Sequence, residues 1–193
     1  MADLGLVSGG YDGKVYRWPR AGAGFGPRET LVVLKDPHVA CHAADWDGDG
    51  RTDVLVGARH GEVLLLRSLG ARVAEPVEIA KAPAGDAGPH AADWDGDGDL
   101  DLLVGDAKGT VTLYRNAGKK LASGETLVDR ALRVVEERCR TSEECAMRAK
   151  PWVADWNGDK KADLLVGDFH DHREPGREGN EHMHGWVWLY ARK

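Results

Sequence analysis

A nine-residue acidic pattern that occurs three times constrains this chain more than any other feature. The first copy reads Asp-Trp-Asp-Gly-Asp-Gly-Arg-Thr-Asp over residues 45–53, and related copies cover residues 93–101 and 155–163. Each copy has oxygen-bearing side chains at positions one, three, five and nine, and an apolar run ending in Val-Gly follows at once. Alternate carboxylates in a tight glycine-containing loop converge on one point. The chain must therefore place such a loop directly before each of three apolar strands.

Convergent oxygens at this spacing predict up to three Ca²⁺ sites, because Ca²⁺ takes about six to eight oxygen ligands. The expected ligands of the first loop are Asp45, Asp47, Asp49, the carbonyl of Arg51, and Asp53. Those of the second loop are Asp93, Asp95, Asp97, the carbonyl of Asp99, and Asp101. Those of the third loop are Asp155, Asn157, Asp159, the carbonyl of Lys161, and Asp163. The third loop departs most from the pattern, since Asn157 lowers its charge and Lys160 replaces a glycine that eases the turn.

Three other interpretations of the loops are weaker. An EF-hand needs a glutamate at position twelve, and this position holds Val56, Val104 and Val166. Mg²⁺ prefers to keep several waters rather than enter a protein cage of this kind. Polar turns without a metal do not explain three repeats of one nine-residue pattern.

A longer repeat surrounds the loops. The three loops begin at 45, 93 and 155, and glycine-led strands at Gly13, Gly61, Gly109 and Gly185 raise the number of units to four. A period of 48 to 62 residues fits a four-stranded antiparallel sheet per unit, as in a propeller blade. We expect an all-β, single-domain propeller segment of about four blades over residues 1–193. Its units cover about 3–35, 38–82, 86–137 and 150–193, with strand counts of three, four, four and three.

The first and last units are expected to be incomplete. Residue 3 aligns inside a calcium loop, and the chain stops just after the third strand of the fourth unit. The pattern predicts either a part of a longer propeller or self-association through the incomplete end blades, because an unpaired strand leaves an open edge. Residues 126–138 fit either a helix or the fourth strand of the third unit, and the repeat favours the strand.

The pattern Ala-Asp-Trp-Asp-Gly-Asp-Gly-x-x-Asp-Leu-Leu-Val-Gly resembles the FG-GAP (VCBS-type) repeat, which also builds the propellers of integrin α-subunits. The resemblance covers nearly the whole chain. It implies a β-propeller, structural calcium on the loops, and an extracellular, secreted or cell-surface location. It also implies that His42, His90 and Trp152, each three residues before a loop, line a central channel.

Composition excludes two classes of partner. The chain has 26 Lys and Arg against 32 Asp and Glu, a net charge of −6, and no basic stripe for nucleic acid. No apolar run is long enough to span a membrane. The first ten residues lack the basic start and apolar core of a signal peptide.

Two further segments carry candidate chemistry. His170 with His172, and His182 with His184, either clamp a transition metal between two arms of a loop over residues 169–184 or belong to a solvated hairpin extension. A catalytic histidine–carboxylate pair in this loop is a further alternative. Cys139 and Cys145 either form a disulfide or stay unpaired.

The aromatic and cysteine positions have simpler interpretations. The tryptophans at loop position two either offer stacking faces for sugars or fill equivalent slots between blades; they are Trp46, Trp94 and Trp156. The aromatic residues on or beside the third strands are expected between blades; they are Trp18, Tyr114, Trp186, Trp188 and Tyr190. Cys41 is expected to be a buried small apolar residue.

The sequence thus predicts a calcium-stabilised, non-catalytic module for extracellular ligand binding or adhesion, with a protein or a carbohydrate as partner. The alternatives are the propeller part of a secreted hydrolase or lyase, and a structural domain beside a catalytic one.

Overall fold

The computed structural model describes residues 5–35, 37–68, 72–118, 120–129, 147–173 and 181–192, and every regular element in this part is a β-strand. The first eight strands are β1 (Leu6–Gly9), β2 (Lys14–Trp18), β3 (Arg20–Ala21), β4 (Gly24–Phe25), β5 (Glu29–Val33), β6 (Ala40–Ala44), β7 (Asp53–Gly57) and β8 (Glu62–Leu66). The other eight are β9 (Val77–Lys81), β10 (Gly88–Ala92), β11 (Asp101–Gly105), β12 (Val111–Tyr114), β13 (Glu125–Val128), β14 (Met147–Ala154), β15 (Asp163–Arg173) and β16 (Glu181–Tyr190). The predicted all-β class is confirmed.

The described strands form four antiparallel sheets that follow one another along the chain. Their strand orders are β1-β2-β5, β6-β7-β8-β9, β10-β11-β12-β13 and β14-β15-β16, beside the small hairpin β3-β4. We call these sheets blades one to four. Within the described residues they have three, four, four and three strands, as the repeat predicted.

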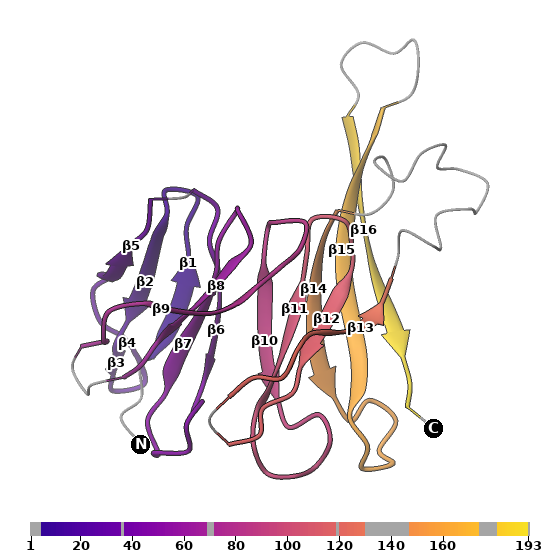
Figure 1. The fold of residues 1–193 in the computed structure, drawn as a ribbon. Coiled ribbons are helices and arrows are strands. Elements are labelled where there is room, and N and C mark those ends of the chain that lie inside the picture. The colour runs from indigo at the N-terminus through magenta and orange to yellow at the C-terminus, as the bar shows by residue number, and fades with distance from the viewer. Residues whose placement is uncertain are drawn as a thin grey trace.

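The blades stand side by side in chain order (Figure 1). Neighbouring blades meet through the strands that come first in each, since β1 contacts β6, β6 contacts β10, and β10 contacts β14. The acidic loops join the first strand to the second in blades two, three and four, and they lie at the same end of the molecule. This is the arrangement of a propeller segment, in which each blade presents its loop to the same side.

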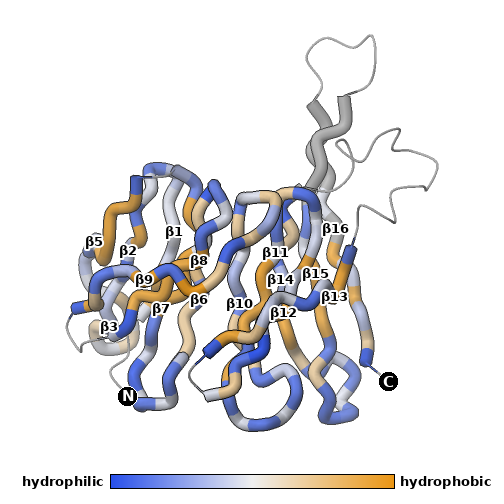
Figure 2. The backbone as a smooth tube through the Cα atoms, viewed as in Figure 1, coloured by the Kyte–Doolittle hydropathy of each residue, from blue (hydrophilic) through white to orange (hydrophobic). Residues whose placement is uncertain are grey.

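The hydrophobic core is divided among the seams between blades. Val15 of blade one packs on Val54, Val56 and Leu66 of blade two. A second cluster joins blades two and three, and a third joins blades three and four. In Figure 2 the apolar stretches follow the strands, and the connecting acidic loops are hydrophilic. Each blade is therefore stabilised mainly by its neighbours, because burying one Val or Leu side chain contributes about 1.5–3 kcal/mol.

Two connecting segments refine the sequence prediction. Residues 125–128 are the strand β13, which confirms the strand over the helix for the start of the segment; residues 130–138 lie outside the described residues. In blade four, β15 and β16 pair continuously from Leu164 opposite Tyr190 to Arg173 opposite Glu181, so the histidine-rich segment extends the hairpin.

The extended hairpin places the four histidines in two register pairs. His170 is opposite His184, and His172 is opposite His182. Their side chains lie outside the described residues, and the predicted metal clamp stays a prediction. No helix in the described part of the chain is long and apolar enough to cross a membrane.

Candidate functional site

The aspartate at position nine fastens each acidic loop to its blade. In blade two the backbone N–H of Trp46 donates to Asp53 Oδ2 at 3.2 Å, and that of Ser68 donates to Asp53 Oδ1 at 2.7 Å. The same two bonds recur at Asp101 and Asp163. One carboxylate therefore ties the start of the loop to a residue just beyond the third strand of the sheet.

Burial and charge act together on these fastening carboxylates. Burial raises the pKa of Asp53 above the usual aspartate value, and the nearby carboxylates of Asp47 and Asp49 raise it further. The pKa of Asp101 is raised for the same reasons, by burial first and then by Asp95 and Asp97. Each loop therefore concentrates negative charge over a buried acid, and a bound cation would relieve the repulsion.

The first loop brings together the carboxylates of Asp45, Asp47 and Asp49. One oxygen from each lies within 4.8 Å of the other two. The Oδ2 atom of Asp45 accepts a hydrogen bond from Gly50, whereas its Oδ1 atom is buried without a hydrogen-bond partner. A buried carboxylate oxygen with no donor is costly, so this atom is the best single indication that the loop fits a cation.

The second loop has the same cluster with fuller internal bonding. Asp93, Asp95 and Asp97 also offer oxygens within 4.8 Å of one another. Asp93 accepts hydrogen bonds from the backbone of Gly96 at 2.7 Å and Gly98 at 3.2 Å. A carboxylate oxygen retains further acceptor capacity, so these residues also fit a hard cation with oxygen ligands.

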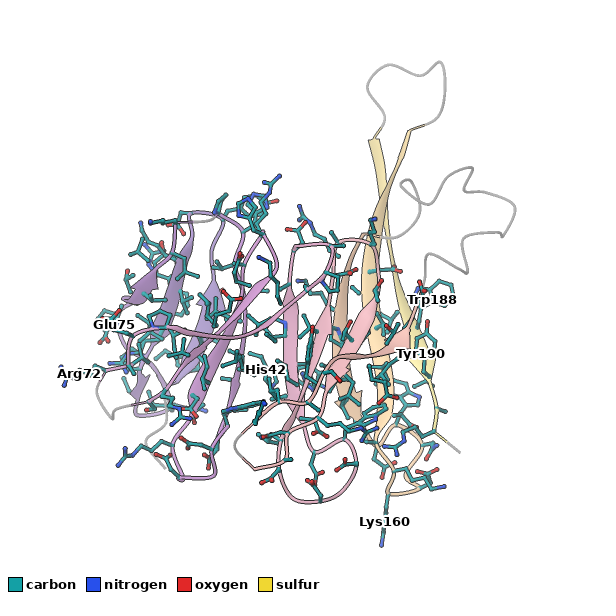
Figure 3. The ribbon with its side chains drawn as sticks, in the orientation of Figure 1. His42, Arg72, Glu75, Lys160, Trp188 and Tyr190 are labelled. Carbon is teal, nitrogen blue, oxygen red and sulfur yellow. The ribbon has the colours of Figure 1, made fainter. Side chains whose placement is uncertain are left out.

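The third loop has the same backbone plan and fewer carboxylates. The carboxylate of Asp155 accepts hydrogen bonds from the backbone N–H groups of Gly158 and Lys160. The side-chain amide of Asn157 donates to Asp159 Oδ2, and its Oδ1 atom accepts from the backbone N–H of Asp159. Lys160 lies at the tip of the loop and points away from the sheets (Figure 3). The expectation of a poorer third site stays a prediction.

Two arginines that the sequence analysis missed sit against the loops. Arg67 lies 3.5 Å from Asp47 Oδ2, and Arg115 lies 2.8 Å from Asp95 Oδ2. Both come directly after the third strand of their blade, so their shared repeat position was the signal that could have found them. Each arginine partly balances the position-three carboxylate of its loop.

The loops form walls of two pockets at the seams between blades. The larger has a volume of about 730 Å³ and lies between blades two and three. It is lined by Trp46, Asp47, Leu65, Arg67, Ile79, Asn116, Gly118, Lys120 and Leu121. The smaller, of about 410 Å³, lies between the second and third loops, with Trp94, Lys160 and Arg192 among its lining residues. Both pockets combine an indole with charged groups.

A family comparison decides what kind of chain this is. The model of the FG-GAP-like repeat matches residues 45–104 and again residues 93–166, so it covers more than half of the chain. The chain belongs to the FG-GAP-like repeat family. The matched segments contain all three acidic loops and the seams on which the pockets lie. No curated protein sequence matched the chain.

A solved lectin has a similar fold. It is a lectin from Agrocybe aegerita whose title describes specific recognition of non-reducing terminal N-acetylglucosamine. The sequences are 21% identical, the TM-score is 0.51, and the match covers 86% of this FG-GAP chain and 48% of the lectin chain. The chain therefore spans about half the length of that structure. At this identity the likeness supports the β-rich repeat fold.

The turn in the third FG-GAP loop carries backbone strain that glycine would remove. Lys160 has φ +67°, at the position where Gly50 has +82° and Gly98 has +96°. A left-handed conformation costs a residue with a Cβ about 1 kcal/mol. Glycine relieves this strain but adds an entropic penalty of about 0.5 kcal/mol. We therefore expect Lys160→Gly to raise the free energy of unfolding by about 0.5 kcal/mol, measured by urea denaturation.

The neighbouring lysine provides the control for this substitution. Lys161 is not among the residues with positive φ, so Lys161→Gly gives only the entropic penalty of glycine and should lower stability. Equal effects of the two substitutions would contradict the assignment of strain to Lys160.

The aromatic residues before the loops form a stack across the FG-GAP blades. The ring centroids of His42 and His90 are 4.3 Å apart, and those of His90 and Trp152 are 4.6 Å apart. His90 is buried, and its Nε2 atom accepts a hydrogen bond from the backbone N–H of Val153 at 3.1 Å. Burial, with His42 close by, lowers the pKa of His90 to about 3, so it stays neutral. The stack thus connects blade two to blade three and blade three to blade four. His90 is packed between these blades, so it does not offer a free side chain to a ligand in a central channel.

The tryptophans at loop position two differ in burial from blade to blade. Trp46 is half-buried against the cluster between blades two and three, and also lines the larger pocket. Trp94 is buried beneath the guanidinium of Arg192, which lies 4.7 Å from the ring centroid. Trp156, in the last blade, is exposed. Packing between blades thus accounts for the first two.

Other residues from the sequence analysis fall outside these sites. Cys41 is half-buried against the cluster between blades one and two, and burial raises the pKa of its thiol. Trp188, expected between blades, is instead substantially exposed and donates from Nε1 to Asp168 at 3.0 Å. Cys139 and Cys145 lie outside the described residues.

Proposed function

We propose that this chain is a non-catalytic binding module whose acidic loops hold structural calcium and whose inter-blade pocket takes a carbohydrate. Its place of action is extracellular or at the cell surface. The observation that carries the proposal is the position of the larger pocket, because the first acidic loop forms its wall through Trp46 and Asp47.

Calcium in this proposal is a structural ion. Asp45, Asp47 and Asp49 in the first loop, and Asp93, Asp95 and Asp97 in the second, supply carboxylate oxygens close enough to share one ion. The ion would supply positive charge where carboxylates crowd, and so hold the loop in one conformation. Asp53 and Asp101 keep the base of each loop attached to its blade.

The pocket has the chemistry that carbohydrates require. A sugar presents an apolar C–H face, which packs on an aromatic ring, and hydroxyl groups, which bond to planar polar side chains. Trp46 offers the indole, while Arg67 and Asp47 offer charged hydrogen-bonding groups 3.5 Å apart. Leu65 and Ile79 add apolar lining. A module of this kind binds without chemistry, by presenting a preformed site on a rigid scaffold.

The ligand class has support from outside the pocket. The Agrocybe aegerita lectin, whose fold is similar, recognises non-reducing terminal N-acetylglucosamine according to its title. Saccharides ending in N-acetylglucosamine are therefore the first probes for this chain. An extracellular location suits both calcium loops, which need abundant Ca²⁺, and a glycan ligand.

Titration calorimetry with chitotriose, in calcium-containing buffer, tests the carbohydrate site. We expect saturable binding, and at least a ~10-fold weaker affinity for Arg67→Ala, about the loss of one charged hydrogen bond or 1.4 kcal/mol. Arg67 is partly exposed at the pocket wall, so the substitution should leave the fold intact.

Arg115→Ala is the matched control. Arg115 holds the same repeat position and contacts the equivalent loop aspartate, Asp95, but does not line the larger pocket. The Arg115→Ala protein should bind chitotriose as tightly as the unmodified chain. Absence of saturable binding to chitotriose and to a panel of glycans, or an equal loss in both variants, would refute the carbohydrate site.

A further inference from the structure

One side of blade four faces away from blade three. In the other blades, the equivalent side carries apolar residues that are buried against the next blade, and blade four carries similar residues there. We call the side of a blade that faces the next blade in the chain its forward face, and the opposite side its back face. Strand register aligns the forward face as a row: His42, Leu55 and Leu65 in blade two. The equivalent rows are His90, Leu103 and Leu113 in blade three, and Trp152, Leu165 and Leu189 in blade four.

Burial differs sharply along equivalent positions. Val63 and Val111 are fully buried beneath the next blade, whereas Val187, at the same position in blade four, is 73% exposed. Leu65 and Leu113 are buried, whereas Leu189 is 45% exposed. Trp94 is 8% exposed and Trp156 is 64% exposed. Blade four thus has a forward face with the composition of an interior and the exposure of a surface.

We propose that the forward face of blade four is an interface that binds the back face of blade one of a second copy of this chain. Each of the three seams between the described blades is made in this way. Leu55 of blade two meets Leu102 and Val104 of blade three, and Leu103 of blade three meets Leu164 and Val166 of blade four. The internal seams therefore define what covers a forward face, namely the back face of a blade of the same repeat.

Blade one has the complementary face. Leu6 occupies the position of Val54, Leu102 and Leu164, which are buried in the seams, and it is 50% exposed. Beside it on the same face, Trp18 stands where Leu66 is buried in blade two. Leu6 and Trp18 form a register pair, so they present one apolar patch.

Two such contacts close a symmetric dimer. In a head-to-tail pair, each copy donates its forward face and its back face, and both are covered at once. With the four blades that the structure describes in each copy, the ring has eight. This number lies within the range of about four to eight blades found in propellers.

Light scattering after size exclusion tests the interface on the full chain. At about 50 µM we expect a mass of ~42 kDa, twice the 21.0 kDa of one chain. Val187→Glu and Leu6→Glu should each give the mass of one chain, since a buried carboxylate would face apolar side chains. Both side chains are half or more exposed in the single chain, so circular dichroism and melting temperature should change little.

A matched substitution and a mixing experiment complete the test. Val77→Glu makes the same change at a 59% exposed valine on β9, and should leave the dimer intact. A mixture of the Val187→Glu and Leu6→Glu proteins should regain dimers, because one seam then has both native faces. A single-chain mass for the unmodified protein up to 100 µM, or a dimer that survives either glutamate, would overturn the proposal.

Discussion

Removal of calcium with EGTA is expected to lower the melting temperature of this protein by at least ~10 °C. A ligand bound only by the folded state stabilises it by about 4 kcal/mol per site when its concentration is 1,000 times Kd. Two loops fit the ion, and each kcal/mol shifts the melting temperature of a chain of this size by roughly 2–4 °C. Without the ion, three carboxylates remain within 4.8 Å of one another in the first loop, where Arg67 pairs with Asp47 and Arg51 with Asp49.

Differential scanning calorimetry with calcium added back provides the measurement. Added Ca²⁺ should restore the transition, and Mg²⁺ should restore it less, since Mg²⁺ fits a cage of protein oxygens poorly. Asp49→Asn with Asp97→Asn should lower the melting temperature in calcium and make it insensitive to EGTA. Glu78→Gln, an exposed carboxylate on β9, is the control and should behave as the unmodified chain. An unchanged transition in EGTA would exclude structural calcium, whatever the result with chitotriose.

Replacing Gly105 by alanine is expected to lower the free energy of unfolding by about 3 kcal/mol. A Cβ placed at Gly105 would lie 2.6 Å from the carbonyl carbon of Ala149, in the segment that enters the next blade. A Cβ placed at Gly57 would likewise lie 2.7 Å from the carbonyl carbon of Ala87, and one at Gly9 would lie 2.7 Å from that of Val39. The obstacle is backbone on both sides, so the blades must move apart, and overpacking of this kind costs a few kcal/mol. Urea denaturation measures the loss.

Gly167 provides a control at the same repeat position. Gly167 ends the matching apolar run of blade four. A Cβ placed there would have the Lys150 carbonyl oxygen as its nearest neighbour, at 3.9 Å, which is an ordinary contact. Gly167→Ala should therefore change stability by less than ~0.5 kcal/mol. If Gly105→Ala and Gly167→Ala were equally harmful, the cause would lie in the strand itself and not in the seam between blades.

Much of the fold could be predicted because the same pattern of loop and strand residues occurs in several units of the sequence. The apolar runs after the loops became β7, β11 and β15, and the glycine-led runs became strands within β8, β12 and β16. Strand counts of three, four, four and three also came from alignment on Gly13 and its equivalents. Such local patterns set strand identity because side chains alternate across a sheet with a period of two residues.

The candidate site was predicted only in part. The loop aspartates stand together as expected in the first two loops, but their association with Arg67 and Arg115 was missed. These arginines lie about twenty residues from the loops in sequence, and only the pairing of β7 with β8 and of β11 with β12 brings them close. The pocket was missed for the same reason, because its walls come from two blades.

The sequence by itself determined the acidic loops, the strands that come after them and the number of blades, since each of these depends on residues that are neighbours along the chain. Only the tertiary structure decided which equivalent positions are buried. Val63, Val111 and Val187 share one place in the repeat, yet the first two are covered by the next blade and the third is exposed. Burial depends on which surface lies opposite, and a repeat pattern is the same whether or not a further blade is there to cover it.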